Sequence, residues 1–465
     1  MTATPNSATR RRHRHVVVVG GGISGLAAAL ALAERTAGAD VTIEVREADT
    51  DLGGKLRTSP FAGLDAVDEG ADAFLARVPD ATALANRVGL GAALTSPTGA
   101  TASVWHHGLH TLPGGLALGV PGDLVRLAAS GLLSWRGKAR AALEPLLPRR
   151  ADDGDAIGAL VRGRFGDEVH ERLVDALVGS IYGADTDHFS LAMVPQLAAL
   201  AGSGRSLLLG ARRVRNRTDA SSGPLFLAPV AGMGALATAT AGAAGSAGVT
   251  IHTGARAQTV ARDGDRWRVD DTIADAVVLA TPARATATLV EPVAPQLARL
   301  LAMMDHAGVA IVTVAVDRWP ERLANRSGYL VPKPVQRTVT AVSFGSQKWA
   351  HWRCGGEDKE ILRISLGRDG LALDGLTDDD LVTRAVDEVG GHLDFDLQPS
   401  ATRVSRWPAA FPQYRPHHRT WLAAVHSARP TGLFVTGASY DGIGVPACVA
   451  QATATASDVA AWLGG

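Results

Sequence analysis

Three glycines near the N-terminus have the spacing of a nucleotide-binding turn. The segment Gly20-Gly21-Gly22-Ile23-Ser24-Gly25 matches G-x-G-x-x-G, directly after a β-branched run and directly before an Ala- and Leu-rich stretch. The first glycine permits a tight turn, the second lets main-chain N–H groups approach a pyrophosphate, and the third lets a helix pack closely on a strand. Glu47 follows at the offset of an acid that binds ribose hydroxyls. These residues predict a dinucleotide site; a glycine-rich turn with a surface glutamate is the alternative.

A second glycine pair favours FAD over a nicotinamide cofactor. After Glu47-Ala48, the chain continues with Gly53-Gly54-Lys55 and Arg57. This segment resembles the second FAD motif of glutathione-reductase-type and amine-oxidase-type flavoproteins. Both glycines would bring main-chain N–H groups to the pyrophosphate, and Lys55 or Arg57 would balance its charge. Either base could equally be a solvated surface residue.

A third segment lies near the C-terminus, at residues 437–446. It follows an apolar strand pattern and ends at Pro446, a residue suited to the first turn of a helix. A helix N-terminus aimed at a flavin would favour the negative charge of the reduced ring. An ordinary strand–loop–helix corner is the alternative.

The elements that must position these motifs predict an α/β protein. The apolar pattern predicts parallel strands at 16–19 and 41–45 around a helix at 24–34. It also predicts further buried strands at 275–282 and 432–437. Helical patterns at 123–133, 155–165 and 168–178 form a separate block, and β-formers at 308–316 and 360–366 predict a second sheet. A helix is expected at 446–462. The predicted architecture is a discontinuous Rossmann-type FAD-binding domain, a mixed α+β substrate domain and an inserted helical subdomain. Its predicted boundaries are a disordered tail at 1–14; FAD binding at 15–90, 222–290 and 425–465; substrate binding at 91–112 and 291–424; and helices at 113–221.

Composition narrows the function classes. The chain of 465 residues has a formal net charge of zero, so no long-range field would attract nucleic acid. Cys354 and Cys448 form no metal-binding or disulfide pattern, which fits the cytoplasm. A basic run at 10–14 before an apolar stretch resembles a signal peptide, but glycines interrupt that stretch. No transmembrane span and no metal site are expected, and peripheral membrane contact stays open.

At this level the chain resembles the bacterial coproporphyrinogen III oxidase and protoporphyrinogen oxidase family, within the amine-oxidase superfamily. The resemblance covers residues 15–462 and is carried most specifically by residues 108–113, 181–191, 407–417 and 437–448. It implies FAD contacts from the first glycine motif and Glu47 onward to the last helix. The residues concerned are Gly20, Gly21, Gly22, Ile23, Ser24, Gly25, Glu47, Ala48, Gly53, Gly54, Lys55, Gly70, Ala71, Asp72, Ala73, Ala257, Trp407, Ala438, Ile443, Gly444 and Val445.

The resemblance also implies a reaction: removal of six electrons from a porphyrinogen in three steps, with O2 reoxidising the flavin and releasing H2O2. No catalytic residue is assigned, because hydride transfer needs aligned placement more than an acid or base. Basic side chains should meet the substrate carboxylates, and Tyr182 could stack on a pyrrole or simply pack. The candidate bases, each of which could instead be an exposed charge, are Arg77, Arg205, Lys348 and Arg353.

The substrate is expected to be coproporphyrinogen III, because the Arg-, Ala- and Gly-rich composition resembles actinobacteria, whose haem pathway usually runs through coproporphyrin. Protoporphyrinogen IX is the alternative, followed by a carotenoid or an amine as the substrate of a related enzyme. A flavin-binding scaffold without turnover is a further alternative. A ferrochelatase would use the product.

Overall fold

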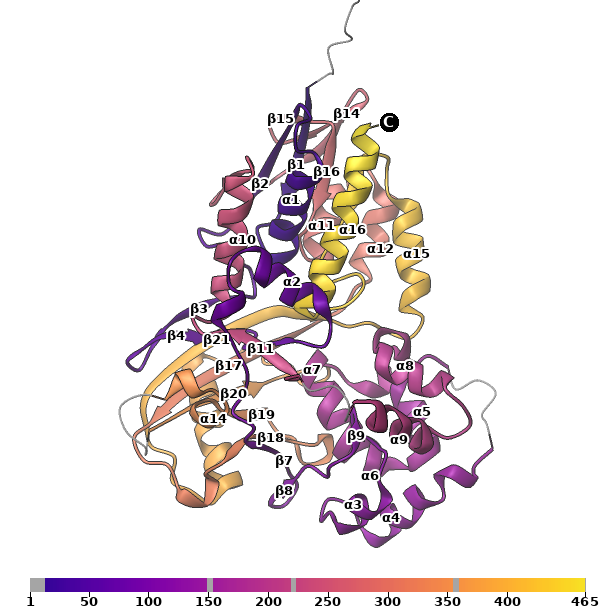
Figure 1. The fold of residues 1–465 in the computed structure, drawn as a ribbon, viewed down its shortest axis with the longest axis vertical. Coiled ribbons are helices and arrows are strands. Elements are labelled where there is room, and N and C mark those ends of the chain that lie inside the picture. Colours follow the sequence, from indigo (N-terminus) through magenta and orange to yellow (C-terminus); the bar gives the residue numbers. More distant parts are fainter. Residues whose placement is uncertain (1–12, 149–153, 219–222, 354–358, 465) are drawn as a thin grey trace, which may run out of the picture.

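A parallel five-stranded sheet brings together segments from both ends of the chain (Figure 1). The computed structural model describes residues 13–148, 154–218, 223–353 and 359–464. Within the sheet, Val18 lies between Val45 and Val278, each in parallel register. The strand order is β12-β2-β1-β16-β22, with bounds Thr250–His252, Val41–Arg46, Arg14–Val19, Ala276–Leu279 and Leu433–Val435.

Both faces of this sheet are covered, which explains the continuous apolar runs in three of its strands, β1 (residues 16–19), β16 and β22. Val16 and Val18 face one core, with helices α1, α2, α10 and α16, whereas Val17 and Val19 face the other. The first group of helices is α1 (Ile23–Arg35), α2 (Pro79–Arg87), α10 (Gly234–Ser246) and α16 (Val445–Gly464). The second face carries α11 (Ala283–Val290), α12 (Pro295–Ala302), α15 (His418–Ala428) and the small sheet β13 (Val260–Asp263), β14 (Arg266–Val269) and β15 (Thr272–Ala274).

A second, seven-stranded sheet is mostly antiparallel. Its longest pairing places Val312 of β17, second in the strand order, between Ile364 and Val404, and helix α14 (Asp378–Leu393) covers this apolar face. The order is β21 (Pro399–Pro412), β17 (His306–Val316), β20 (Glu360–Leu366), β19 (Val339–Phe344), β18 (Arg326–Leu330), β7 (Thr101–Trp105) and β8 (Leu109–Thr111).

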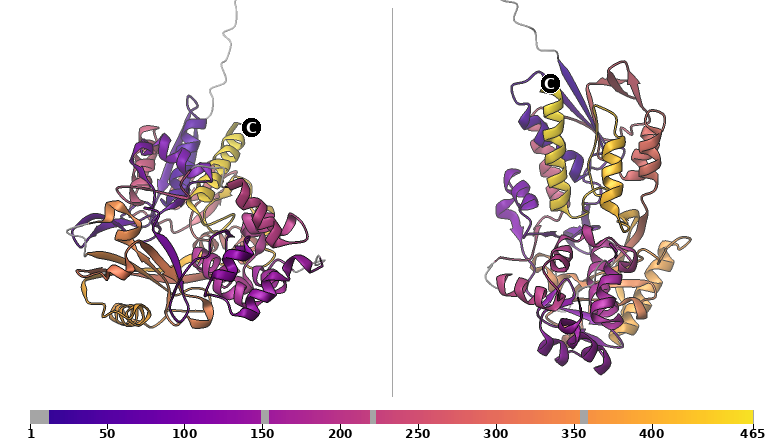
Figure 2. Two further views of the ribbon diagram at one scale, coloured as in Figure 1. Left: turned by 60° about the horizontal axis from the view of Figure 1, so that its bottom comes forward. Right: turned by 90° about the vertical axis from the view of Figure 1, so that its right-hand side faces the viewer.

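A block of helices lies beside the second sheet, and both lie below the parallel sheet in Figures 1 and 2. The block includes one unusual element, a π-helical segment at His170–Gly179. The others are α3 (Leu124–Ala129), α4 (Trp135–Ala142), α5 (Ile157–Phe165), α6 (Asp167–Val169), α7 (Ser180–Tyr182), α8 (Pro195–Gly202) and α9 (Leu207–Thr218).

Short elements connect these three parts. They are β3 (Thr58–Phe61) with β4 (Leu64–Asp68), β5 (Phe74–Leu75) and β6 (Leu94–Thr95) with β11 (Phe226–Pro229), β9 (Leu116–Ala117) with β10 (Val120–Pro121), and α13 (Gly345–Lys348). Among the described residues, no helix combines the length and apolar character needed to cross a bilayer.

The predicted elements are confirmed with two corrections. The helix expected at 123–133 ends at Ala129, because the Ser130 hydroxyl accepts a hydrogen bond from Leu132 N and starts a turn. The helix expected at 168–178 is present, but most of it winds as a π-helix. Of the predicted tail, residues 1–12 lie outside the described residues, and Arg14 already belongs to β1. The exact domain boundaries stay a prediction.

Candidate dinucleotide site

The turn after β1 contains glycines with two different roles. A Cβ on Gly25 would lie 1.9 Å from the carbonyl oxygen of Gly20, so α1 can approach β1 only without a side chain there. A Cβ on Gly22 would meet no protein atom within 4 Å. Gly22 is also the N-cap of α1 and offers no capping side chain. Open space in front of a helix N-terminus fits a pyrophosphate, so the residues present suit a dinucleotide.

Glu47 is held beside this turn. Its carboxylate accepts hydrogen bonds from Gly21 N at 2.5 Å and Asp49 N at 2.8 Å, which leaves further acceptor capacity for hydroxyl groups. The next residue, Ala48, is exposed. The carbonyl oxygen of Glu47 accepts from Ala255 N at 2.7 Å, which brings the half-buried Ala257 segment past the same edge.

The second glycine pair joins the first. Gly53 N donates to Gly21 O at 2.9 Å, and Gly53 and Gly54 have φ values of +103° and +59°, which favour glycine. Lys55 extends from this pair to the second sheet, where its Nζ donates to the carbonyl oxygen of Ala410. Burial lowers the pKa of Lys55.

The segment from Gly70 to Ala73 lies between the two sheets. A Cβ on Gly70 would lie 2.3 Å from the Lys55 carbonyl oxygen and 3.4 Å from the ring of Trp407. Trp407, on β21, donates its indole N–H to Glu69 O at 3.0 Å. Lys55, Gly70 and Trp407 therefore meet at one place, with Ala71 exposed and Ala73 half-buried next to them.

Asp72 is bound by cations of the second sheet. Its Oδ2 lies 2.6 Å from Lys348 Nζ and 3.2 Å from Arg363, and it accepts a hydrogen bond from the Trp349 indole at 3.3 Å. Burial acts to raise the pKa of Asp72, but Lys348 and Arg363 outweigh burial and hold this pKa well below its usual range. Arg363 also donates to the carbonyl oxygen of Gly70.

The C-terminal loop closes the site from the other end of the chain. A Cβ on Gly437 would lie 3.8 Å from Ser24 Oγ, and Ala438 O accepts a hydrogen bond from the Tyr414 hydroxyl. Ile443, Gly444 and Val445 follow at the start of α16, which lies alongside α1 (Figure 1). The N- and C-terminal motifs are thus neighbours in space.

The predicted substrate-binding bases differ in their surroundings. Lys348 is paired with Asp72, and the exposed Arg353 donates to Ser346 O of the same short helix at 3.3 Å; Arg77 and Arg205 are exposed. Tyr182 lies with its ring 4.9 Å from that of Phe189. Sequence reasoning missed Arg363 and Tyr414; the signal for Arg363 was a lone arginine inside the apolar strand at residues 360–366.

The glycine turns, the fixed Glu47 and the paired chain ends define a flavoprotein. The chain belongs to the flavin-containing amine oxidoreductase family, whose sequence model matches residues 23–460. FAD is its cofactor.

Within this family the chain is similar to bacterial proteins named coproporphyrinogen III oxidase. It is 29% identical to the one from Bacillus subtilis (strain 168), over 97% of this chain and 98% of that protein. It is 34% identical to the one from Mycobacterium tuberculosis (strain ATCC 25618 / H37Rv), over 94% and 96% respectively. A solved structure named "putative protoporphyrinogen oxidase", from Exiguobacterium sp. 255-15, superposes with a TM-score of 0.86 at 27% identity, covering 97% of this chain and 99% of that chain.

Proposed function

We propose that this protein is an oxidase that converts coproporphyrinogen III to coproporphyrin III in haem biosynthesis, with O2 as acceptor and H2O2 as by-product. The observation that carries the proposal is the similarity over nearly the whole chain to several bacterial proteins named coproporphyrinogen III oxidase. The reaction removes six electrons and six protons in three equal steps. Bound FAD supplies a two-electron acceptor at the hydride level.

We further propose the roles of the chain's own residues. The N-terminus of α1, with Gly22 and Gly53, binds the pyrophosphate, and Glu47 accepts hydrogen bonds from the ribose. Main-chain groups of residues 70–73 and of the loop before α16 border the flavin, beside Trp407. No side chain is assigned as acid or base, because hydride transfer depends on placement. The apolar strands around the site exclude water.

A protoporphyrinogen IX oxidase is the second candidate. The similarity to the Exiguobacterium structure favours it. Protoporphyrinogen IX has two propionates and coproporphyrinogen III has four, so the two differ in the cationic groups they need. A likeness to putrescine oxidase at 18% identity and a TM-score of 0.67 shows the fold alone.

An anaerobic titration tests the function. The purified FAD-loaded protein is mixed with coproporphyrinogen III, with protoporphyrinogen IX or with putrescine, and the oxidised-flavin absorbance and porphyrin fluorescence are recorded. Fast bleaching and fluorescence with coproporphyrinogen III are expected. A flavin that stays oxidised with both porphyrinogens would refute the proposal, and faster bleaching with protoporphyrinogen IX would favour the second candidate.

We also propose the cytoplasm as the location, a ferrochelatase as the downstream enzyme, and a peripheral contact with anionic lipid.

The lipid contact is supported by exposed apolar side chains at one end of the helical block, among them Val125, Trp135 and Leu146. Arg126 and Arg136 are exposed among them; Arg126 pairs with Asp123 at 3.6 Å, and Glu144 is buried. The protein should sediment together with anionic vesicles, and Trp135→Ser should lower the fraction that sediments. Equal sedimentation with neutral vesicles would contradict the charge argument.

A further inference from the structure

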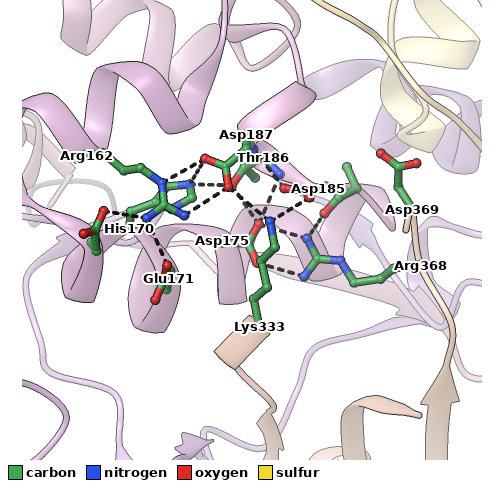
Figure 3. Close-up of polar contacts among 12 residues, drawn as sticks. Arg162, His170, Glu171, Asp175, Asp185, Thr186, Asp187, Lys333, Arg368 and Asp369 are labelled. Atoms are coloured by element: carbon green, nitrogen blue, oxygen red, sulfur yellow. Dashed lines mark hydrogen bonds and ion pairs between the residues drawn. The ribbon is translucent and has the colours of Figure 1, made fainter. Parts of the chain in front are cut away.

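Residues 181–191, the part of the helical block that most specifically resembles the oxidase family, include none of the predicted FAD contacts. They are instead held by a buried ion pair between the helical block and the second sheet (Figure 3). Asp175 and Arg368 form two hydrogen bonds, of 2.8 and 2.9 Å, and are only 0% and 6% exposed. Arg368, two positions beyond β20, also donates to the carbonyl oxygen of Ala184.

The π-helical winding brings two side chains onto one hydroxyl group. Thr186 Oγ1 lies 2.8 Å from His170 Nε2 and donates to Asp175 Oδ1 at 2.7 Å. Five positions in an α-helix turn the chain by about 500°, which leaves the two side chains about 140° apart. The i→i+5 bonding of a π-helix winds the chain more loosely, so residues five apart lie closer to the same face. The π-segment at His170–Gly179 thus allows both His170 and Asp175 to reach Thr186.

Two glycines make room for this arrangement. A Cβ on Gly179 would lie 2.8 Å from Ala184 O and 3.0 Å from the Arg368 guanidinium. Gly183 has a φ of +55°, and a Cβ there would lie 2.8 Å from the ring of Phe411, on β21. The turn at 182–184 can therefore approach the sheet only with glycine at both positions.

A second cation, Lys333 in the turn between β18 and β19, binds the same segment. Lys333 lies 2.6 Å from Asp185 and 3.1 Å from Asp187, and Arg162 of α5 forms two hydrogen bonds with Asp187 (Figure 3). The acids at 175, 185 and 187 are thus all paired with cations. Asp175 and Arg368 are the most deeply buried of these groups.

The far end of the segment reaches the C-terminal FAD loop. Ser190 N donates to Tyr414 O at 2.7 Å, and the Tyr414 hydroxyl donates to Ala438 O. Gln413 Nε2 donates to Gly183 O at 3.3 Å. One short segment therefore contacts the second sheet, the end of β21 and, through Tyr414, the C-terminal loop.

We propose that the porphyrinogen reaches the flavin between residues 181–191 and β21, and that Asp175 and Arg368 are positioning residues for it. The segment lies against Phe411 of β21, the strand that also carries Trp407 at the proposed flavin site, and the ion pair holds it there. This inference rests on the proposed function. Neither residue bonds to the glycine turns or to Glu47 in the described part of the chain, and the segment reaches the FAD site only indirectly, through Tyr414. The main effect of the pair is therefore expected on the substrate and at most a small one on FAD.

Variants of the pair test the proposal in the FAD-loaded protein. Arg368→Met and Asp175→Asn should raise KM for coproporphyrinogen III roughly tenfold, with kcat changed less than about threefold, because a loosened segment weakens substrate binding equally in the ground and transition states. The FAD dissociation constant should stay within about twofold of wild type, since no predicted FAD contact changes. Arg368→Lys, which keeps the charge but loses the two-point geometry, should be intermediate. The control Lys359→Met removes an exposed ion pair with Asp317 on the same sheet and should change nothing.

Hydrogen exchange provides a readout that needs no substrate. Amides of residues 181–191 should exchange faster in Arg368→Met and Asp175→Asn, while amides of the glycine turns keep the wild-type rate. An unchanged KM, a fall in FAD affinity, or unchanged exchange at 181–191 would each overturn the inference. If Arg368→Met does not fold, the same criteria apply to Arg368→Lys. A wild-type protein that oxidises neither porphyrinogen would refute the proposed function. The hydrogen-exchange measurement would still show whether the ion pair holds residues 181–191 in place.

Discussion

At the scale of single residues, two glycines of the same motif are needed for different reasons. Gly25 has no room for a side chain, because the Gly20 carbonyl oxygen fills the space. Gly22 has room and an ordinary backbone, with φ −70° and ψ 172°, so nothing in the protein requires glycine there. The requirement at Gly22 is best explained by a ligand that approaches the main chain closely.

The variants Gly22→Ala and Gly25→Ala should separate these two reasons. Gly22→Ala should change the free energy of unfolding of the apoprotein by less than about 1 kcal/mol. It should weaken FAD binding about tenfold or more, which corresponds to about 1.4 kcal/mol. Gly25→Ala should destabilise the apoprotein itself by about 3 kcal/mol. Denaturant unfolding measures the stability of each variant, and FAD titration measures its affinity. Unchanged FAD affinity in a folded Gly22→Ala would contradict the proposal that Gly22 borders the pyrophosphate.

Asp72 should make stability depend on acid pH. The pKa of Asp72 in the folded protein lies below the unfolded value near 3.9. The carboxylate therefore stabilises the protein fully above about pH 5, and this stabilisation is lost progressively as the pH falls from there towards the folded-state pKa. Asp72→Asn leaves Lys348 and Arg363 without their partner and should cost about 3–5 kcal/mol at pH 7.

Unfolding of wild type and Asp72→Asn, followed between pH 7 and pH 3.5, measures this dependence. The difference in unfolding free energy should narrow below about pH 4. Asp265→Asn, in the exposed turn between β13 and β14, is the control and should show no such difference. A gap for Asp72→Asn that stays constant to pH 3.5 would rule out the ion pairs as its cause.

At the scale of elements, the loop before α16 is held by a residue from outside the parallel sheet. Tyr414 follows β21, is fully buried, and donates its hydroxyl to Ala438 O. This contact connects the second sheet with the loop that borders the predicted FAD site. The loop's conformation therefore depends on a residue far from it in the sequence.

Tyr414→Phe should loosen this loop. Loss of the hydroxyl leaves the Ala438 carbonyl without its donor and should cost about 1–3 kcal/mol of stability. FAD affinity should fall about threefold to tenfold, because the loosened loop destabilises the FAD-bound protein more than the free protein. Tyr329→Phe is a matched control, because it removes a buried hydroxyl of β18 that bonds to His392 of α14 at 3.2 Å. Equal FAD affinities in both variants would show that Tyr414 does not order the loop.

At the scale of the whole molecule, the FAD-binding sheet is completed only by the last part of the chain. β22 is an edge strand that pairs with β16, and α16 lies along α1. A chain that lacks these elements exposes Val278 and the apolar face of α1, which are both buried in the complete protein.

Deletion of residues 431–465 should therefore abolish FAD binding and cooperative unfolding. Circular dichroism during thermal unfolding and FAD titration, with the full chain in parallel, test this expectation. A truncated protein that unfolds cooperatively and turns yellow with FAD would show that the C-terminal elements are dispensable.

The sequence by itself determined the local features. The buried valine run before Gly20, the glycine spacing, Glu47 and the last helix depend on contacts between near neighbours or on backbone geometry, which residue types specify directly. The parallel sheet, the second sheet and the helical block were predicted for the same reason, because apolar periodicity reports burial.

The partners of the charged residues were decided only by the tertiary structure. Lys348 was a candidate for substrate binding or an exposed charge, and it lies against Asp72, which is 276 positions away. Arg368 meets Asp175 across 193 positions. The π-winding that brings His170 and Asp175 together on Thr186 has no signature in residue type. A charge has the same appearance in sequence whether it is solvated, paired or bound to a ligand; which of these holds depends on the segments that the fold brings around it.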